Sequence, residues 1–233
     1  MAVVVSVLPA AARAQTGSRP EEWRFYGGDP GHTKYSPLDQ INGGNVDQLR
    51  IAWTWTSVDE TLRAENPVIR DGRMFRTYAH EVTPLLVDGV LYTTTGYSSG
   101  PYLSVDVGGS GDVNATHVRW RRATGAPYVS SLLLYRRLLY MATENGILTV
   151  TDPATGESVS RTRLNGVYTA SPVAADGHIY LLNEDGETVV LEAGPDARIV
   201  SRNPLGERAL ASPAIAHGRF YIRTDQHLWA SGP

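Results

Sequence analysis

Four stretches of the chain read VTPLLVDGVLY (82–92), SSLLLYRRLLY (130–140), ASPVAADGHIY (170–180) and ASPAIAHGRFY (211–221). They align without gaps and begin 48, 40 and 41 residues apart. Each has a small residue or proline near its start, then apolar residues, a turn pair and a final tyrosine. Self-similarity at a fixed period of about 40 residues is the sequence signature of repeat architectures. This period therefore decides the fold.

The turn pairs inside the segments predict β-hairpins. Three of them are Asp88-Gly89, Asp176-Gly177 and His217-Gly218. A pair of this kind between apolar runs favours a type I′ turn, because both of its central residues need positive φ. The second copy has Arg136-Arg137 instead. We therefore expect a looser turn there.

Two more strands follow each hairpin. A second turn comes at Asn145-Gly146, Asp185-Gly186 and Asp225-Gln226, and apolar runs follow it at 147–151, 188–192 and 227–230. A turn such as 152–156 then leads to a fourth strand. Four antiparallel strands in every ~40 residues are typical of a β-propeller blade. A β-sandwich would not require near-identical segments at constant spacing. The prediction is an all-β chain, a β-propeller of about four four-stranded blades that form a closed ring or an open partial propeller.

The two ends of the repeat region suggest a pairing. The fourth copy stops after its third strand, at Ser231-Gly232-Pro233, and Leu49–Thr56 (LRIAWTWT) alternates like a strand without a blade of its own. We expect this strand to complete the last blade, because that removes an open edge. The only helix expected is a short turn near Gly43–Leu49, with an N-cap offered by 42–45.

Composition excludes several classes of protein and site. The 21 basic and 24 acidic residues give a net charge of -3, which argues against a nucleic-acid partner. No cysteine is present, so disulfides, thiolate metal sites, a cysteine nucleophile and covalent haem are excluded. No stretch approaches the ~20 apolar residues of a membrane span.

The first residues read as an export signal. Ala2–Leu8 is a short apolar run, and Ala12-Arg13-Ala14 is a small-x-small cleavage pattern. The positively charged start is missing, so either the true start lies upstream or the segment is a frayed tail. We expect a signal-peptide remnant at 1–14, an N-terminal extension at 15–48 and the propeller repeats at 49–233. A periplasmic or secreted location follows from this interpretation.

Two sets of motifs carry a family resemblance. Trp23–Asp29 (WRFYGGD), the residues that follow it to Trp53, and His80–Leu85 (HEVTPL) closely resemble the N-terminal entry of pyrroloquinoline quinone (PQQ)-dependent dehydrogenases. The resemblance covers roughly 23–97. From Gly100 onward the chain is similar to PQQ-binding-like repeat proteins, a broader group that includes non-catalytic propellers. The expectation is a shortened or degenerate member of this family.

The resemblance implies a chemistry and one contact residue. In such enzymes an ortho-quinone accepts a hydride from an alcohol, a Ca²⁺-type ion polarises the quinone, and an aspartate removes the hydroxyl proton. Glu81 matches the glutamate that contacts PQQ; the alternative is a rim glutamate retained by descent. Catalytic and metal-binding residues cannot be assigned, because a hard cation takes six or more oxygens and one glutamate does not supply them.

Two functional classes therefore remain. One is a quinoprotein-type dehydrogenase using PQQ and Ca²⁺ on a small alcohol or sugar. The other is a non-catalytic periplasmic propeller that binds a protein or ligand, or associates with itself. The six histidines are scattered without helical pairing, so a zinc site is not predicted.

The family resemblance also implies how neighbouring blades are locked together. In the family, a tryptophan docks eight residues after the Asp of a D-x-x-T-G turn. Trp120 stands at this offset from Asp112, whereas Ser160 stands at the same offset from Asp152. Trp120 is therefore expected to dock on a neighbouring blade, and the locking of the later blades is expected to be degraded.

Overall fold

The computed structural model describes residues 21–29, 34–56, 82–94 and 100–232. These residues form almost only strands. The one helix among them is the short 3₁₀ helix η1 (Val46–Gln48), which follows Asn45. The sequence prediction of an all-β chain with a single helical turn at this place is confirmed.

Apart from one pair of short strands described below, the strands form four consecutive antiparallel sheets, here called blades 1 to 4, and each has its strands in chain order. The first three have four strands and the fourth has three, as the repeat predicts. Blade 1 consists of β2 (Leu85–Val87), β3 (Val90–Thr94), β4 (Tyr102–Asp106) and β6 (Val118–Arg122). Blade 2 consists of β7 (Leu133–Tyr135), β8 (Leu138–Ala142), β9 (Ile147–Thr151) and β10 (Ser158–Arg163). Blade 3 consists of β11 (Val173–Ala175), β12 (His178–Leu182), β13 (Glu187–Glu192) and β14 (Ile199–Pro204). Blade 4 consists of β15 (Ala214–Ala216), β16 (Arg219–Arg223) and β17 (Leu228–Ser231).

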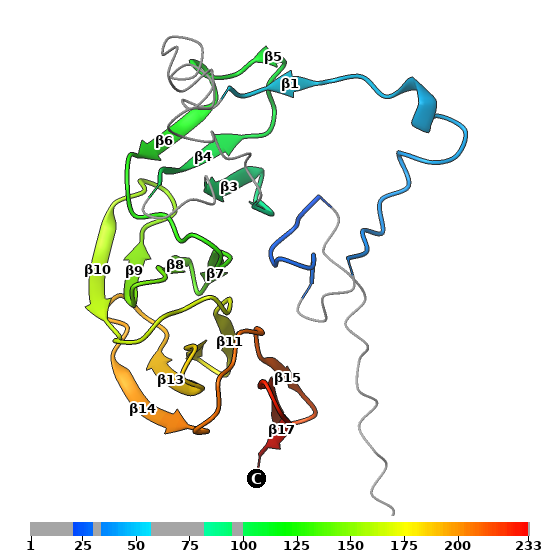
Figure 1. Cartoon of the computed structure of the whole chain (residues 1–233). Coiled ribbons are helices and arrows are strands. Elements are labelled where there is room, and N and C mark those ends of the chain that lie inside the picture. The colour runs from blue at the N-terminus through cyan, green and yellow to red at the C-terminus, as the bar shows by residue number, and fades with distance from the viewer. Residues whose placement is uncertain (1–20, 30–33, 57–81, 95–99, 233) are drawn as a thin grey trace, which may run out of the picture.

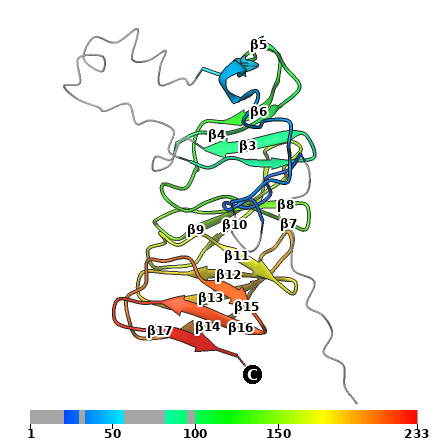
Figure 2. The same ribbon diagram turned by 90° about the vertical axis from the view of Figure 1, so that its right-hand side faces the viewer.

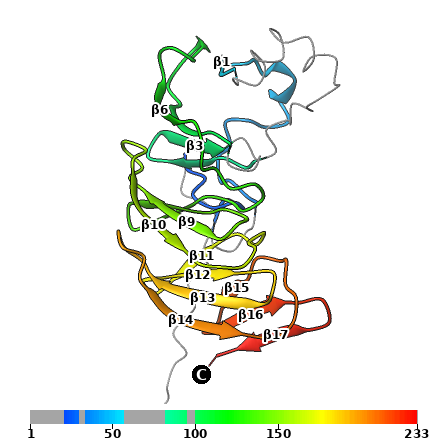
Figure 3. The same ribbon diagram turned by 60° about the vertical axis from the view of Figure 1, so that its left-hand side comes forward.

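The blades follow one another in an open arc (Figure 1). Blade 1 lies at one end and blade 4 at the other, and the sheets stack one upon the next (Figure 2). The outermost strands β6, β10 and β14 follow the convex side (Figures 1 and 3). Of the two forms left open by the sequence, the described residues adopt the partial propeller.

All four inner hairpins contain the same two-residue turn. Both central residues have positive φ in the Asp88, Asp176 and His217 turns, each with the glycine that follows. Arg136 and Arg137 also adopt positive φ, 48° and 63°. Leu134 pairs with Leu139 across this turn in the same register as in the other copies. The expectation of a looser turn was wrong, because apolar strands on both sides fix the register and force two arginines into a conformation they disfavour.

The strand predicted to complete blade 4 lies elsewhere. β1 (Trp53–Thr54) pairs in parallel with β5 (Gly111–Asp112), at the blade 1 end of the arc. Trp53 and Trp55 pack against a buried cluster formed by Leu103, Val105 and Val113. The prediction was wrong because alternation identifies a strand but not its partner. Here the indole rings of Trp53 and Trp55 pack against an apolar surface of blade 1.

The core consists of the layers between blades. One face of each blade packs against the opposite face of the next. The largest cluster joins blades 2 and 3, a second joins blades 1 and 2, and a smaller one joins blades 3 and 4. Tyr140 and Leu181, which meet in the first of these, have no exposed surface. Because every blade needs a neighbour to bury its faces, the fold is held by stacking rather than by one central core.

Trp120 is the docking residue that the sequence predicts. It is 8% exposed, lies edge-on to Tyr102, and donates from Nε1 to the Pro153 carbonyl of blade 2 at 2.9 Å. Ser160 takes the corresponding place in blade 2, where its Oγ donates to the Pro195 carbonyl of blade 3 at 2.5 Å. The locking of this junction therefore keeps its hydrogen bond and loses its aromatic packing.

Candidate functional site

The family resemblance assigns a ligand contact to Glu81, and the repeat shows which positions of the other blades correspond to it. This residue lies outside the described residues, and its predicted role remains a prediction. The repeat aligns it with Val129, Thr169 and Leu210, each of which precedes an inner strand. The second hairpin turns, 143–147, 183–187 and 224–227, and the linkers 164–170 and 205–211 share this end of the blades. We call these segments the linker face.

Backbone hydrogen bonds join the linker face into a continuous rim. The Tyr168 N–H donates to the Glu144 carbonyl at 3.1 Å, and the Glu184 N–H donates to the Val167 carbonyl at 2.8 Å. Blades 3 and 4 repeat the arrangement, since Ala209 N–H donates to the Glu184 carbonyl and Asp225 N–H to the Arg208 carbonyl. Each linker is therefore held between the turns of the two blades that it connects. The backbone groups on this rim are largely used for structure.

A row of serines connects the inner ends of the blades. The Ser131 N–H donates to Ser171 Oγ at 3.0 Å, and the Ser171 N–H donates to Ser212 Oγ at 2.9 Å. We call this row the serine ladder. Sequence reasoning noted only a small residue at these positions. The three serines take the same position in the aligned segments, and this was the signal that could have identified a shared role.

Several hydroxyl groups of the linker face are buried. Thr169 Oγ1 has no hydrogen-bond partner among the described residues, and neither has Ser130 Oγ, which lies outside the linker face. Tyr168 is 1% exposed, and burial raises its pKa to about 12. Buried hydroxyls of this kind are places where ordered water or a polar ligand atom makes the missing bond.

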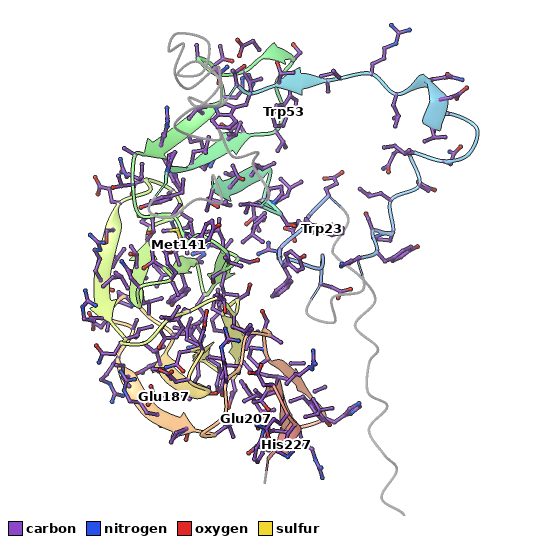
Figure 4. All side chains as sticks on the ribbon, viewed as in Figure 1. Trp23, Trp53, Met141, Glu187, Glu207 and His227 are labelled. Atoms are coloured by element: carbon purple, nitrogen blue, oxygen red, sulfur yellow. The ribbon has the colours of Figure 1, made fainter. Side chains whose placement is uncertain are left out.

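Blade 4 carries the one histidine–carboxylate pair of the described residues. His227 Nδ1 lies 2.8 Å from Glu207 Oε2, and the Gln226 N–H donates to the other carboxylate oxygen at 2.5 Å. Burial alone would raise the pKa of Glu207, but the hydrogen bonds from His227, Thr224 and Gln226 lower it. Figure 4 shows Glu207 and His227 side by side at the blade 4 end. The pair fixes the second turn of blade 4 to the linker before it.

The family motif at Trp23–Asp29 lies beside the inner strand of blade 1. Trp23 and Leu86 exchange both backbone hydrogen bonds, at 2.7 and 2.8 Å. Gly28 has φ +88°, and a Cβ there would lie 3.1 Å from the Trp23 ring. The segment lies on the concave side of the arc (Figure 1). The glycine of this motif is thus required by close packing against the indole.

The described residues do not assemble a cation site. They contain no group of three or more histidine, aspartate or glutamate residues placed to hold a metal ion. Glu144 and Glu184 occupy equivalent turns on different blades, and His227 has Glu207 as its partner. A Ca²⁺-type ion needs several convergent oxygens. The donor set in this part of the chain does not fit the ion that the family resemblance implies.

Two family models match separate parts of the chain. "Glucose/ethanol/alcohol dehydrogenase, beta-propeller domain" matches residues 23–108, and "Outer membrane protein assembly factor BamB" matches residues 144–231. The first match contains the Trp23–Asp29 motif and most of blade 1. The second contains β9 and β10 of blade 2 and all of blades 3 and 4.

Curated relatives and solved structures of similar chains include quinone-dependent dehydrogenases. The dehydrogenase subunit of a quinone-dependent alcohol dehydrogenase from Gluconobacter oxydans is 34% identical over 42% of this chain and 11% of its own length. A quinate/shikimate dehydrogenase (quinone) from Acinetobacter baylyi is 27% identical over 81% of this chain and 21% of its own length. The solved quinohemoprotein alcohol dehydrogenase of Pseudomonas putida HK5 superposes with a TM-score of 0.65 at 18% identity, over 87% of this chain and 34% of that one.

The chain therefore spans about a fifth or less of the curated relatives' length. In the described residues no helix is long and apolar enough to cross a membrane. The stacked blades, the Trp23–Asp29 motif and the two family matches are those of a PQQ-dependent dehydrogenase-like β-propeller.

Proposed function

We propose that the chain is a periplasmic quinoprotein-type propeller unit that contributes one contact, from Glu81, to a PQQ-type ligand. The observation that carries the proposal is the family match over 23–108, which spans the Trp23–Asp29 motif and the entry to blade 1. When bound, such a quinone supplies the hydride acceptor for oxidation of an alcohol or sugar. The role of this chain is to contact one edge of the ligand and to hold blade 1 in place.

The proposal assigns no alcohol oxidation to the isolated chain. The described residues offer no cation cage, and the rim of the linker face uses its backbone groups to join the blades. A complete quinoprotein site would need further ligands and a proton acceptor, from residues outside the described ranges or from other chains. The export-type pattern at Ala2–Ala14 supports the periplasmic location.

The test is direct titration of the purified chain with PQQ, with and without Ca²⁺, followed by quinone absorbance and by calorimetry. Glu81→Gln keeps the size of the side chain and removes its charge. We expect measurable but weak binding that the substitution abolishes, and no dye-linked turnover of alcohols or sugars. Robust Ca²⁺-dependent dye reduction by a verified monomer, lost in Glu81→Gln, would instead establish a complete enzyme.

A non-catalytic scaffold is the second candidate. It is favoured by the rim of the linker face, which is tied by hydrogen bonds from blade 2 to blade 4 and forms no metal centre among the described residues. Wild-type protein that shows no PQQ binding at any Ca²⁺ concentration would support this function over the first.

A further inference from the structure

Two Asn-Gly pairs lie against each other at the junction of blades 2 and 3. Asn145-Gly146 belongs to the second hairpin turn of blade 2, and Asn165-Gly166 belongs to the linker that leads to blade 3. A Cβ on Gly146 would lie 2.8 Å from the Gly166 carbonyl oxygen. Both asparagine side chains are exposed, so water reaches each of them. The third Asn-Gly pair of the chain, 42–43, precedes η1.

An Asn-Gly pair has a chemistry of its own, because glycine has no side chain to hinder attack by its backbone nitrogen. The glycine nitrogen attacks the asparagine Cγ and loses its proton, and the side-chain nitrogen leaves as ammonia. The product is a cyclic imide, a succinimide. Water then opens the ring at either carbonyl and gives aspartate or isoaspartate. The reaction consumes only water, and it requires that the glycine nitrogen and the side-chain amide can approach each other.

The structure holds Asn145-Gly146 away from this reaction. The Gly146 N–H donates to the Thr143 carbonyl at 3.0 Å. The side chain is tied to the same residue, since Thr143 Oγ1 donates to Asn145 Oδ1 at 2.6 Å. Gly146 is buried, and its carbonyl accepts from the Leu164 N–H at 2.8 Å. Both reacting groups of this pair are therefore engaged in the turn.

The neighbouring pair has no such restraint. Among the described residues, no hydrogen bond involves the Gly166 N–H or the Asn165 side chain, and both residues are exposed. The linker is fixed on either side of the pair, by the Leu164 N–H on the Gly146 carbonyl and by the Tyr168 N–H on the Glu144 carbonyl. Asn165 also has φ +63°, in the left-handed region. The reacting groups are thus available in the folded chain.

We propose that Asn165 is a site of spontaneous deamidation in the folded chain, and that the turn of blade 2 protects Asn145. The product adds a carboxylate to the linker face. In the isoaspartate form the backbone gains one methylene between the two anchored residues Leu164 and Tyr168, which loosens the junction of blades 2 and 3. Asn165 has a blade of this chain on either side, and the proposal does not depend on PQQ binding.

The test is incubation of the purified full chain at mildly alkaline pH, followed by peptide mapping with mass spectrometry. Trypsin separates the two pairs, because Arg161 and Arg163 lie between them. Isoaspartate is measured independently by labelling with protein isoaspartyl methyltransferase. A parallel incubation in urea gives the rate of each pair in the unfolded chain.

In the folded chain we expect Asn165 to convert about tenfold or more faster than Asn145, because two hydrogen bonds must open before Asn145 reacts. In urea the two rates should agree within about twofold, since the turn is absent. Equal rates in the folded chain, or faster conversion of Asn145, overturn the proposal.

A variant of the turn tests the protection directly. Thr143→Val removes the hydroxyl that holds the Asn145 side chain, and Thr143→Ser is the matched control that keeps it. We expect the valine variant to raise the rate at Asn145 about threefold or more and to change Asn165 less than about twofold. An unchanged rate at Asn145 in a folded valine variant would contradict the protection. Circular dichroism verifies folding, and the comparison of folded and urea-unfolded wild type decides the proposal if the valine variant does not fold.

Discussion

Removal of the Trp120 side chain is expected to separate blade 1 from blade 2. Trp120 is almost fully buried between Tyr92, Tyr102 and the Asp152–Gly156 turn, and its Nε1 donates to the Pro153 carbonyl. Trp120→Ala is expected to lower the free energy of unfolding by about 3–5 kcal/mol, the usual range for a buried tryptophan. Trp120→Phe keeps much of the packing and loses the hydrogen bond, so its cost should be smaller.

Gly156 provides the second arm of a double-mutant cycle. Its φ is +72°, and a Cβ would lie 2.5 Å from two atoms of the Trp120 ring. Gly156→Ala should cost about 1–2 kcal/mol for the backbone conformation and a further 1–3 kcal/mol for the clash. The clash disappears when residue 120 is alanine. The two substitutions should therefore be coupled by about 1–3 kcal/mol.

Urea unfolding followed by far-ultraviolet circular dichroism measures each free energy, with a second probe to check two-state behaviour. Trp120→Leu replaces Trp120→Ala if the alanine variant does not fold. Losses that add within about 0.5 kcal/mol would refute the idea that the indole and the turn form one joint.

Three further outcomes are expected. Burial raises the pKa of Tyr168 to about 12, so its contribution to stability is full below about pH 10 and is lost as the pH rises toward 12. Between pH 8 and pH 11, urea unfolding should show a loss in wild type that is about 1.4 kcal/mol larger than the loss in Tyr168→Phe. Trp53→Ala should accelerate amide exchange in β4 and leave β16 unchanged, because the ring packs on blade 1; faster exchange in β16 alone would mean that the strand joins blade 4. Arg137→Gly should raise the melting temperature by about 2 °C by relieving a positive φ, and an unchanged or lower value would show that the turn carries no such strain.

The sequence predicts most of the fold because its strongest signals are local and repeated. Asp-Gly turns between apolar runs specify hairpins, and their spacing specifies blades. The conformation at Arg136-Arg137 was not predictable from turn preference, since the pairing of Leu134 with Leu139 overrides it. The partner of β1 was not predictable either, because the choice depends on which apolar surface the Trp53 and Trp55 rings reach.

The candidate site was less predictable than the fold. Glu81 was assigned as a contact residue from the family resemblance, and it lies outside the described residues. Tyr168 and the Glu207–His227 pair carry no motif, because their environments arise from contacts between a linker and the next turn.

The serine ladder bears on how such a chain changes its length in evolution. The partners Ser131 and Ser171 are 40 residues apart, and Ser171 and Ser212 are 41 apart. The Trp120–Pro153 and Ser160–Pro195 bonds span 33 and 35 residues. Because each bond joins one repeat to the next, an in-frame duplication of one repeat inside blades 1 to 3 adds a unit that meets both neighbours with bonds already encoded. The gene can lengthen or shorten the arc by whole units without redesigning the interior.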